Sequence, residues 1–495
     1  MAAEHTRWLF GDQLGDYFLD DEDQQVLIVE SQRVFRRRRF HRQKAHLVLS
    51  AMRHRATELG ERCTYLVTDT YREALAQVEG PLSVVQPTTW AAVHLVDALA
   101  TEREIERLPA RGYVTGRGEF TRWADGRGRR RLLMENFYRD ARTRTDVLMK
   151  GAEPVEGRWN FDADNREPPP KTGRLDVPEP WWPKEDEIDA QVRADLDAME
   201  ADGITFVGED GPRKFAASSA EARAALDHFV EHRLPTFGRF EDAMLSGDRW
   251  MAHSLISAPL NLGLLDPLEI VRAAEEAYVA GDAPIASVEG FVRQVMGWRD
   301  YIWNLYWYLG EDYRHENALK ATTPLPDWFT ELDPAGTDAR CLSWAVSSVR
   351  EVGWAHHIPR LMVIGNYAQQ RGWDPQALTD WFHRSFVDGY DWVMVPNVVG
   401  MSQYADDGVL GTKPYVGGGA YVNRMSDFCG DCRYDPKKRT GEDACPFTVG
   451  YWGFLNRNRD HLAGNFRMGQ VLRGLDRLKD LDQLLEEHPE FETRA

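Results

Sequence analysis

The sequence has no long hydrophobic run, few cysteines and no excess of positive charge. No apolar stretch reaches the roughly 18 residues that a membrane-spanning helix needs, so we expect no membrane span. The start, MAAEHTRWLFGDQL, carries charged and polar residues where a signal peptide is apolar, and a cytoplasmic protein is the expectation. Five cysteines among 495 residues are too few for a disulfide framework.

Charge and aromatic content narrow the classes of function. The 60 Lys and Arg residues against 79 Asp and Glu give a net charge of -19, which argues against a globally basic nucleic-acid binder but allows a local basic groove. Aromatic residues make up 11% of the chain. Composition does not distinguish core packing from stacking surfaces or an electron path around a redox cofactor. The length predicts two or three domains.

The first part of the sequence has an α/β pattern. Short apolar runs at 25–30, 65–68 and 82–86 alternate with helical stretches such as 44–59, which predicts a parallel sheet. The first turn, Gly11-Asp12-Gln13-Leu14, is not a GxGxxG phosphate-binding fingerprint.

A proline-punctuated stretch at about 150–190 is typical of a connector, and the pattern after it is helical. We therefore predict an α/β domain over 1–128, a linker over 129–215 and an all-α domain over 216–495. A charged closing helix is expected after Arg467. The clearest other helical stretches are 220–234, 267–279, 288–309, 341–370 and 375–386.

Four cysteines form the sharpest local signal. Cys429 and Cys432 make a CxxC pair, Cys445 follows them, and Cys341 lies upstream on a predicted helix. Four thiolates bind Zn²⁺ or hold a [4Fe–4S] cluster, and the spacing alone favours neither. Free thiols in a reduced compartment are the alternative, which a CxxC pair with a third cysteine nearby disfavours.

Several polar motifs follow one another on the helical part. The segment 253–257, HSLIS, offers hydroxyl and backbone N–H groups that suit a diphosphate, although an ordinary helix cap has the same composition. Further motifs lie at 289–299, 353–360 and 388–392. Each alone favours a structural role, whereas their succession on one helical domain favours a cofactor site.

Together these motifs resemble the iron–sulfur bacterial cryptochromes and photolyases, the prokaryotic (6-4) photolyase group. The likeness covers almost the whole chain and includes WLFGDQL, HSLIS, TKPY and the segments 158–162, 424–429 and 456–468. It implies the cryptochrome/photolyase fold: a Rossmann-like α/β antenna domain, a linker, and a helical domain that holds FAD and a [4Fe–4S] cluster.

The resemblance also implies the residues that hold each cofactor. The cluster ligands would be Cys341, Cys429, Cys432 and Cys445, which favours iron over zinc. In the FAD pocket, Arg360 would pair with Asp388 beside the flavin ring. The remaining pocket residues would be His253, Ser254, Leu255, Ser257, Trp298, Arg299, Tyr390, Asp391 and Met394.

The implied chemistry is light-driven repair of pyrimidine (6-4) photoproducts in UV-damaged DNA. The lesion must leave the duplex to reach the flavin, and repair also needs a proton, for which histidine is the natural donor near neutral pH. His356 and His357 match the catalytic pair, with His357 toward the lesion, and Tyr415 joins them. Met401 and Tyr421 match residues that line the lesion. The alternative for both tyrosines is ordinary loop packing.

DNA contact requires cations against phosphates. Asp162 matches a linker aspartate tied to Mg²⁺-assisted DNA binding. Three basic runs are further candidates, although such runs are usually solvated faces. The runs are Arg33, Arg36, Arg37, Arg38, Arg39, Arg42 and Lys44; Arg127, Arg129, Arg130 and Arg131; and Arg433, Lys437, Lys438 and Arg439. The second and third are favoured because the first lies in the antenna domain.

The chain departs from the family's electron-transfer residues. Met394 stands where the family usually has a glutamate near flavin N5, and a thioether cannot exchange a proton. Asp333 and Phe382 replace a Trp and a Tyr of the photoreduction path. Trp381 and Tyr390 remain as electron-transfer residues, and Trp344 is one candidate for another route.

The antenna pocket is also altered. Glu30, His41 and Lys44 match the family's pocket for a 6,7-dimethyl-8-ribityllumazine antenna. The sequence therefore allows that chromophore to bind but does not establish it. The positions that depart are Val34, Arg37 and Thr88.

Three functions compete. The first is a monomeric (6-4) photolyase, favoured by the His356-His357 pair and the lesion-side residues. The second is a blue-light photoreceptor that keeps FAD and the cluster but repairs little or nothing, favoured by Met394 and the broken Trp path. The third is a light-independent iron–sulfur nucleic-acid protein akin to the primase large subunit, which stoichiometric FAD would exclude.

Overall fold

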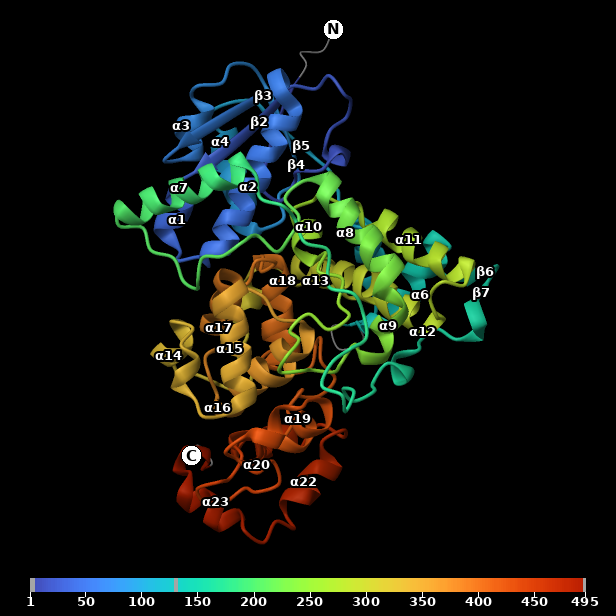
Figure 1. Cartoon of the computed structure of the whole chain (residues 1–495), viewed down its shortest axis with the longest axis vertical. Coiled ribbons are helices and arrows are strands. Elements are labelled where there is room, and N and C mark those ends of the chain that lie inside the picture. The colour runs from blue at the N-terminus through green and yellow to red at the C-terminus, as the bar shows by residue number, and fades with distance from the viewer. Residues whose placement is uncertain (1–4, 129–131, 493–495) are drawn as a thin grey trace.

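The structure, a computed structural model, describes residues 5–128 and 132–492. Three arginines of the second basic run, Arg129, Arg130 and Arg131, lie outside the described residues. Figure 1 shows an α/β unit at the N-terminal end, a helical body in the middle and a smaller lobe of helices at the other end.

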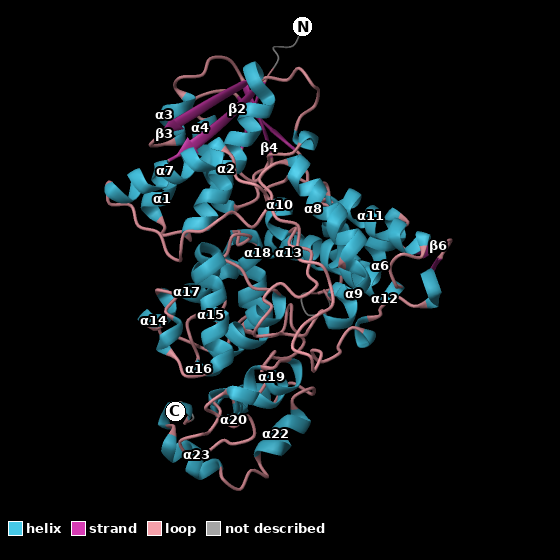
Figure 2. Ribbon diagram, viewed as in Figure 1, coloured by secondary structure: helices cyan, strands magenta, loops and turns pink. Residues whose placement is uncertain are grey.

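Five parallel strands form the sheet of the α/β unit, in the order β3-β2-β1-β4-β5 (Figure 2). They are β1 (Thr6–Leu9), β2 (Val26–Ser31), β3 (Cys63–Thr68), β4 (Leu82–Val85) and β5 (Ile105–Leu108). β2 is buried at every position, as expected where helices cover both faces of a parallel sheet. The three predicted strands are present. The sequence pattern does not reveal β1 and β5, which are four residues long and carry charged side chains.

The stretch predicted as a linker folds back on the α/β unit. Its helix α7 (Glu187–Ala201) lies along α2 (Arg42–Leu59), as Figure 1 shows. Arg42 reaches Glu200 at 2.6 Å and Arg53 reaches Asp195 at 2.5 Å. Earlier in the same stretch lie α6 (Met134–Thr145) and a short antiparallel pair, β6 (Met149–Lys150) and β7 (Glu153–Pro154). The domain limits at 128 and 215 stay a prediction.

The helical body confirms the all-α character of the second half. Its main helices are α8 (Ser219–His232), α11 (Pro267–Ala280), α12 (Ile285–Val292), α13 (Asp300–Leu309), α15 (Arg340–Val352), α16 (Asn366–Arg371), α17 (Pro375–Ser385) and α18 (Asp391–Val395). None of the helices in the described part of the chain is long and apolar enough to cross a membrane.

The single helix predicted over 341–370 is wrong. α15 ends at Gly353, whose φ of 60° is the left-handed conformation in which glycine closes helices. A short loop over 354–356 follows, and the backbone becomes helical again at His357, two residues before Pro359. This break places His356 at the end of the loop and His357 at the start of the next helical segment.

The C-terminal lobe contains α19 (Gly419–Met425), α20 (Pro446–Arg457), α21 (Arg459–Leu462), α22 (Gly469–Leu475) and α23 (Leu481–Glu487). The closing helix predicted after Arg467 is wrong, because α22 and α23 are separate helices. Leu475 packs in one apolar cluster with Phe454, whereas Leu484 packs in another with Phe491, so the chain turns between them.

Candidate functional site

Three π-helical turns shape the centre of the helical body. They are η7 (Arg293–Arg299), η10 (Pro359–Gly365) and η11 (Pro396–Ser402). They carry Arg299, Arg360 and Met401 of the predicted site residues. Such turns are rare and frequently mark functional sites. The one at η7 also interrupts the helix predicted over 288–309.

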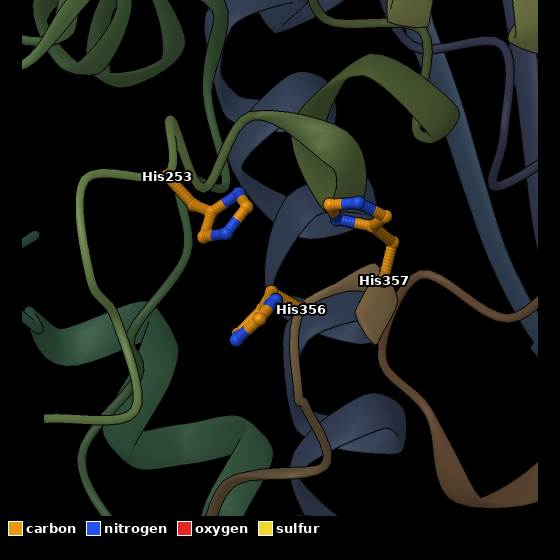
Figure 3. Close-up of side chains that lie close together, drawn as sticks. All are labelled: His253, His356 and His357. Carbon is orange, nitrogen blue, oxygen red and sulfur yellow. The ribbon is translucent and has the colours of Figure 1, made fainter. Parts of the chain in front are cut away.

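Three histidines meet beside η10. Figure 3 shows His253, His356 and His357 together, and one ring nitrogen of each lies within 4.8 Å of the others. The rings of His253 and His356 are stacked, with centroids 4.4 Å apart and planes 21° apart. Because imidazole lone pairs lie in the ring plane, two nearly parallel rings do not converge on one metal ion.

Two of these histidines have ring nitrogens without a partner in the described chain: both nitrogens of His356 and Nε2 of His253. His356 is only 2% exposed. Buried polar atoms are normally hydrogen-bonded, so these nitrogens indicate that a polar ligand lies against them.

The charge within the histidine cluster is asymmetric. Burial, assisted by the neighbouring positive groups, holds the pKa values of His253 and His356 well below the usual range. Burial also opposes protonation of His357, but the hydrogen bond and charge of Asp242, with the charge of Glu241, outweigh it and raise the pKa of His357. The Nε2 of His357 lies 3.2 Å from Asp242 Oδ1, and 42% of the His357 side chain is exposed. Of the three histidines, the accessible one is therefore the one whose surroundings favour the protonated form.

A buried ion pair lies on the inner side of the same segment. Both terminal nitrogens of Arg360 reach Asp388 at 2.9 Å, and Ser257 Oγ donates to the same carboxylate at 2.7 Å. Asn261 binds the Asp388 carbonyl oxygen at 3.1 Å. The structure thus contains the Arg360–Asp388 pair that the resemblance implies and adds Ser257 to it, a residue that the resemblance assigns to the FAD phosphates.

A small cleft lies beside the HSLIS segment and is lined by Ser254, Leu255 and Arg233, among others. Leu255 has a φ of 58°, a strained conformation for a leucine. Arg233 is 2% exposed and donates to the carbonyl oxygens of Pro178, Met251 and His253, with no carboxylate partner in the described chain. Sequence analysis missed Arg233, because nothing in its local pattern distinguishes it from a surface arginine.

Other predicted pocket residues have different neighbours. Arg299 lies over the Tyr113 ring at 4.6 Å and donates to Asn261 at 3.3 Å. The Trp298 ring contacts Tyr301 at 6.1 Å. Asp391 accepts from Tyr306 at 2.8 Å. These three positions connect elements around the site.

Tyr390 and Met394 are both buried. The Tyr390 hydroxyl is buried without a hydrogen-bond partner in the described chain, and Lys44 Nζ lies 5.3 Å from its ring centroid. Met394 is 3% exposed within an apolar cluster.

The lesion-side residues gather near an acidic group. Asp162 lies 3.2 Å from Arg293 and also contacts Arg166. Tyr415 is 38% exposed, and the charges of Asp162 and Arg166 act on its pKa, which burial raises. Burial, with the charge of Asp242, likewise raises the pKa of Tyr421. Met401 is half-buried at the end of η11.

Most cations of the first and third basic runs are engaged by carboxylates. Arg36 pairs with Asp69, Arg39 with Glu331, Arg433 with Asp338 and Arg439 with Asp480. In the second run, Arg127 lies over the Trp123 ring. The runs therefore offer fewer free cations than the sequence indicates.

The four cysteines line one cavity, together with Phe428 and Phe447. Burial and the charges of the other three thiols raise the pKa of Cys341 well above the usual range. In the described chain, no three thiol sulfurs lie within 4.8 Å of one another. A single tetrahedral zinc would hold its sulfurs about 3.8 Å apart, so the cavity suits a larger group.

A row of aromatic rings extends from the Arg360 side to the surface. Arg360 lies over Phe386, whose ring is 5.8 Å from Trp381. Trp381 stacks on Phe329 at 4.2 Å, and Phe329 contacts Trp373 at 4.7 Å. The row ends at Trp328, which is 6.4 Å from Trp373. Sequence analysis named only Trp381 of these tryptophans. Trp344 instead contacts Phe428 at the cysteine cavity.

The residues that match the antenna pocket already have partners within the chain. Glu30 binds Arg53 and Tyr65 at 3.0 and 2.7 Å. Lys44 donates to the carbonyl oxygens of His383 and Gly389, and burial lowers the pKa of Lys44 to about 7. Burial lowers the pKa of His41 to about 4. A nearby cavity of about 520 Å³ is lined instead by Arg36, Arg37, Arg38 and Arg39.

The parallel sheet followed by a helical body that holds this site is the architecture of photolyases. The structure aligns with that of a bacterial class III photolyase from Agrobacterium tumefaciens at a TM-score of 0.59 and 13% identity, over 99% of this chain and 97% of that one. That likeness confirms the predicted fold.

Sequence comparison gives the family. The chain is 40% identical over 448 residues to a (6-4) photolyase from Agrobacterium fabrum (strain C58), across 87% of this chain and 86% of that protein. Residues 7–208 match the family described as deoxyribodipyrimidine photo-lyase-related protein. The chain therefore belongs to the photolyase-related family. An uncharacterized protein of Acanthamoeba polyphaga mimivirus is 30% identical over 133 residues, 27% of this chain and 99% of that one.

Proposed function

We propose that this chain repairs pyrimidine (6-4) photoproducts in UV-damaged DNA by light-driven electron transfer from reduced FAD. The observation that carries the proposal is the histidine cluster. It combines an accessible His357, whose pKa Asp242 raises, with two buried imidazoles whose pKa values are lowered by burial. The named relative from Agrobacterium fabrum supports the same reaction.

The residues present fit FAD. The unpartnered nitrogens of His253 and His356 and the unpartnered Tyr390 hydroxyl need a polar ligand. Ser254, Leu255 and the buried guanidinium of Arg233 line one small cleft, and a hydroxyl and a guanidinium are groups that bind a diphosphate. Arg360 and Asp388 would lie beside the flavin ring. When bound, reduced FAD supplies the light absorption and the electron.

His357 would supply the proton. Its ring is accessible to a base extruded from the duplex, and the Asp242 carboxylate favours the imidazolium form. His356 is buried and would position its neighbour and the lesion. Tyr415, Tyr421 and Met401 would line the lesion, and Asp162 would aid DNA binding. Mg²⁺ at Asp162 would have to replace its contact with Arg166.

We also propose that Cys341, Cys429, Cys432 and Cys445 hold a [4Fe–4S] cluster. The spacing of the thiols and their shared cavity support this assignment over a single zinc. Iron analysis tests it: about four iron atoms per chain are expected for a filled site. One zinc and no iron would contradict it.

A blue-light photoreceptor is the second candidate. The buried Met394 favours it, because a thioether cannot exchange a proton with the flavin. The rings of Trp381, Trp373 and Trp328 weigh against it, since they offer a path that avoids Asp333.

The deciding experiment is a repair assay. Reduced protein that contains FAD and iron is mixed with an oligonucleotide carrying one (6-4) photoproduct, and illuminated and dark samples are compared. Restoration of the intact thymines in light alone is expected. Absence of repair by fully loaded protein would favour the photoreceptor.

A further inference from the structure

One exposed aromatic side chain stands on the C-terminal lobe. Phe466, in the turn between α21 and α22, is 86% exposed, more than any other large hydrophobic side chain in the described part of the chain. Its neighbours Leu462 and Met468 are 1% and 2% exposed. The buried side chains of Leu462 and Met468 thus anchor the turn, whereas the Phe466 side chain points outward.

Hydrogen bonds fix the shape of this turn. Asn465 Oδ1 accepts from the Arg467 backbone N–H at 3.0 Å. Asn465 Nδ2 donates to the Tyr404 hydroxyl and to the Thr412 carbonyl oxygen, both at 3.1 Å. Phe466 is therefore held out by an ordered turn.

The surroundings of Phe466 suit a polyanion. The Arg467 guanidinium lies 5.3 Å from the Phe466 ring centroid. Lys413 follows Thr412, to which the turn is bonded, and is exposed. Neither cation forms an ion pair within the described residues. Two unpaired cations around an aromatic ring would repel a second copy of the same surface, whereas phosphates would bind them.

This surface continues toward the proposed lesion site. Tyr415 lies three residues beyond Thr412, a span of at most about 10 Å. The charge of Asp162 reaches Tyr415, and the charge of Asp242, the partner of His357, reaches Tyr421. The turn that carries Phe466 is thus connected to the rim where the extruded base would enter.

We propose that Phe466 inserts into the DNA duplex and fills the gap that the extruded lesion leaves, with Arg467 and Lys413 on the flanking phosphates. The proposal rests on the proposed repair function, since it needs a lesion outside the duplex. Extruding a base breaks its stacking and pairing, and an apolar side chain between the neighbouring bases replaces part of the lost stacking. Phe466 is in this sense a positioning residue for the lesion.

The test compares Phe466→Ala with the native protein on one oligonucleotide that carries a (6-4) photoproduct, as a duplex and as a single strand. A single strand has no gap to fill. We expect the variant to bind the lesion-bearing duplex about tenfold more weakly, in line with the stacking of one base. Binding to the single strand and its repair should stay within about twofold. Phe466→Leu should recover part of the duplex affinity, because leucine also inserts between bases.

Val279→Ala is the matched control, because Val279 is 78% exposed on α11. It should leave both substrates unaffected. 2-Aminopurine placed next to the lesion reports unstacking directly, and its fluorescence change on binding should differ between Phe466→Ala and the native protein. That signal needs no repair, so a protein that fails to repair either substrate refutes the proposed function and leaves the insertion measurable.

Three results would overturn insertion. Equal affinity of Phe466→Ala and the native protein for the duplex would exclude it. An equal loss of affinity for the duplex and for the single strand would mean that Phe466 makes a general DNA contact or that the variant is misfolded. A change of sedimentation coefficient with Phe466→Ala would assign the side chain to contact between copies of the chain.

Discussion

Two pairs of opposite charge flank the short segment from His356 to Arg360, and they differ in access to water. The outer pair, His357 with Asp242, is 42% and 25% exposed and joined at 3.2 Å. The inner pair, Arg360 with Asp388, is 18% and 6% exposed and joined by two bonds of 2.9 Å. The first is open to a base that binds from outside, whereas the second is closed off from water beside the proposed flavin site. The two pairs therefore differ in which part of the proposed reaction they can reach.

Removing the outer imidazole should have the largest effect. His357→Ala lacks the proposed proton donor, so we expect repair to fall by about 10²–10⁴ while the free energy of unfolding changes little. The rate of light-dependent repair at saturating substrate measures this fall. His94→Ala is the control, since His94 on the α/β unit forms a similar pair with Glu311 of the helical body. Repair by His357→Ala within threefold of the native rate would exclude the donor role.

Breaking the inner pair should act on stability. Asp388→Ala leaves the Arg360 guanidinium without its carboxylate in a buried place, and we expect the free energy of unfolding to fall by about 2–4 kcal/mol. Urea titration followed by tryptophan fluorescence measures the loss. Asp338→Ala breaks an exposed pair with Arg433 and should change stability by less than about 0.5 kcal/mol. Similar losses in both variants would erase the distinction between buried and exposed pairs.

The pH dependence of repair should follow Asp242. Its hydrogen bond and charge raise the pKa of His357 against the opposing effect of burial, so Asp242→Asn should lower that pKa. Repair needs the protonated ring, and its alkaline limit should move by about one pH unit to lower pH. Repair rates between pH 5.5 and 8.5 measure the shift, with Glu311→Gln as the control. An unchanged pH profile would mean that a group other than His357 sets the alkaline limit of repair.

The sequence predicts the elements of this comparison unevenly. The His356-His357 pair, Arg360 and the four cysteines are recognisable because their local motifs resemble those of the photolyase family. Asp242 is not, because it meets His357 from 115 residues away and its neighbours show no motif. Arg233 and Trp373 were missed for the same reason. Their roles depend on which elements pack together.

The fold shows the same limit. Alternating apolar runs predict β2, β3 and β4, and periodic helices predict most of the helical body. The break at Gly353 and the π-helical turns were not predicted, since a periodic apolar pattern continues across them. The break and the π-helical turns change the direction in which the site residues project, compared with a regular helix. The functional centre is thus the region where local periodicity is least informative.

The smallest expected effect is the contribution of the outer pair to stability. The pKa of His357 is raised above its ordinary value of 6.5, so the folded state binds this proton more tightly than the unfolded state. The stabilisation is therefore fully present below pH 6.5 and is lost as the pH rises through the raised pKa. Because the His357 side chain is 42% exposed, water screens the pair, and the effect should stay below about 0.5 kcal/mol.

Asp242→Asn isolates this contribution. The difference in unfolding free energy between the native protein and the variant should be largest at pH 6 and should decrease toward pH 9. Glu311→Gln gives the background for an exposed histidine pair, His94 with Glu311, between the α/β unit and the helical body. A difference that grows with pH would mean that His357 is neutral in the folded protein. Donation by this ring would then require protonation after the lesion binds.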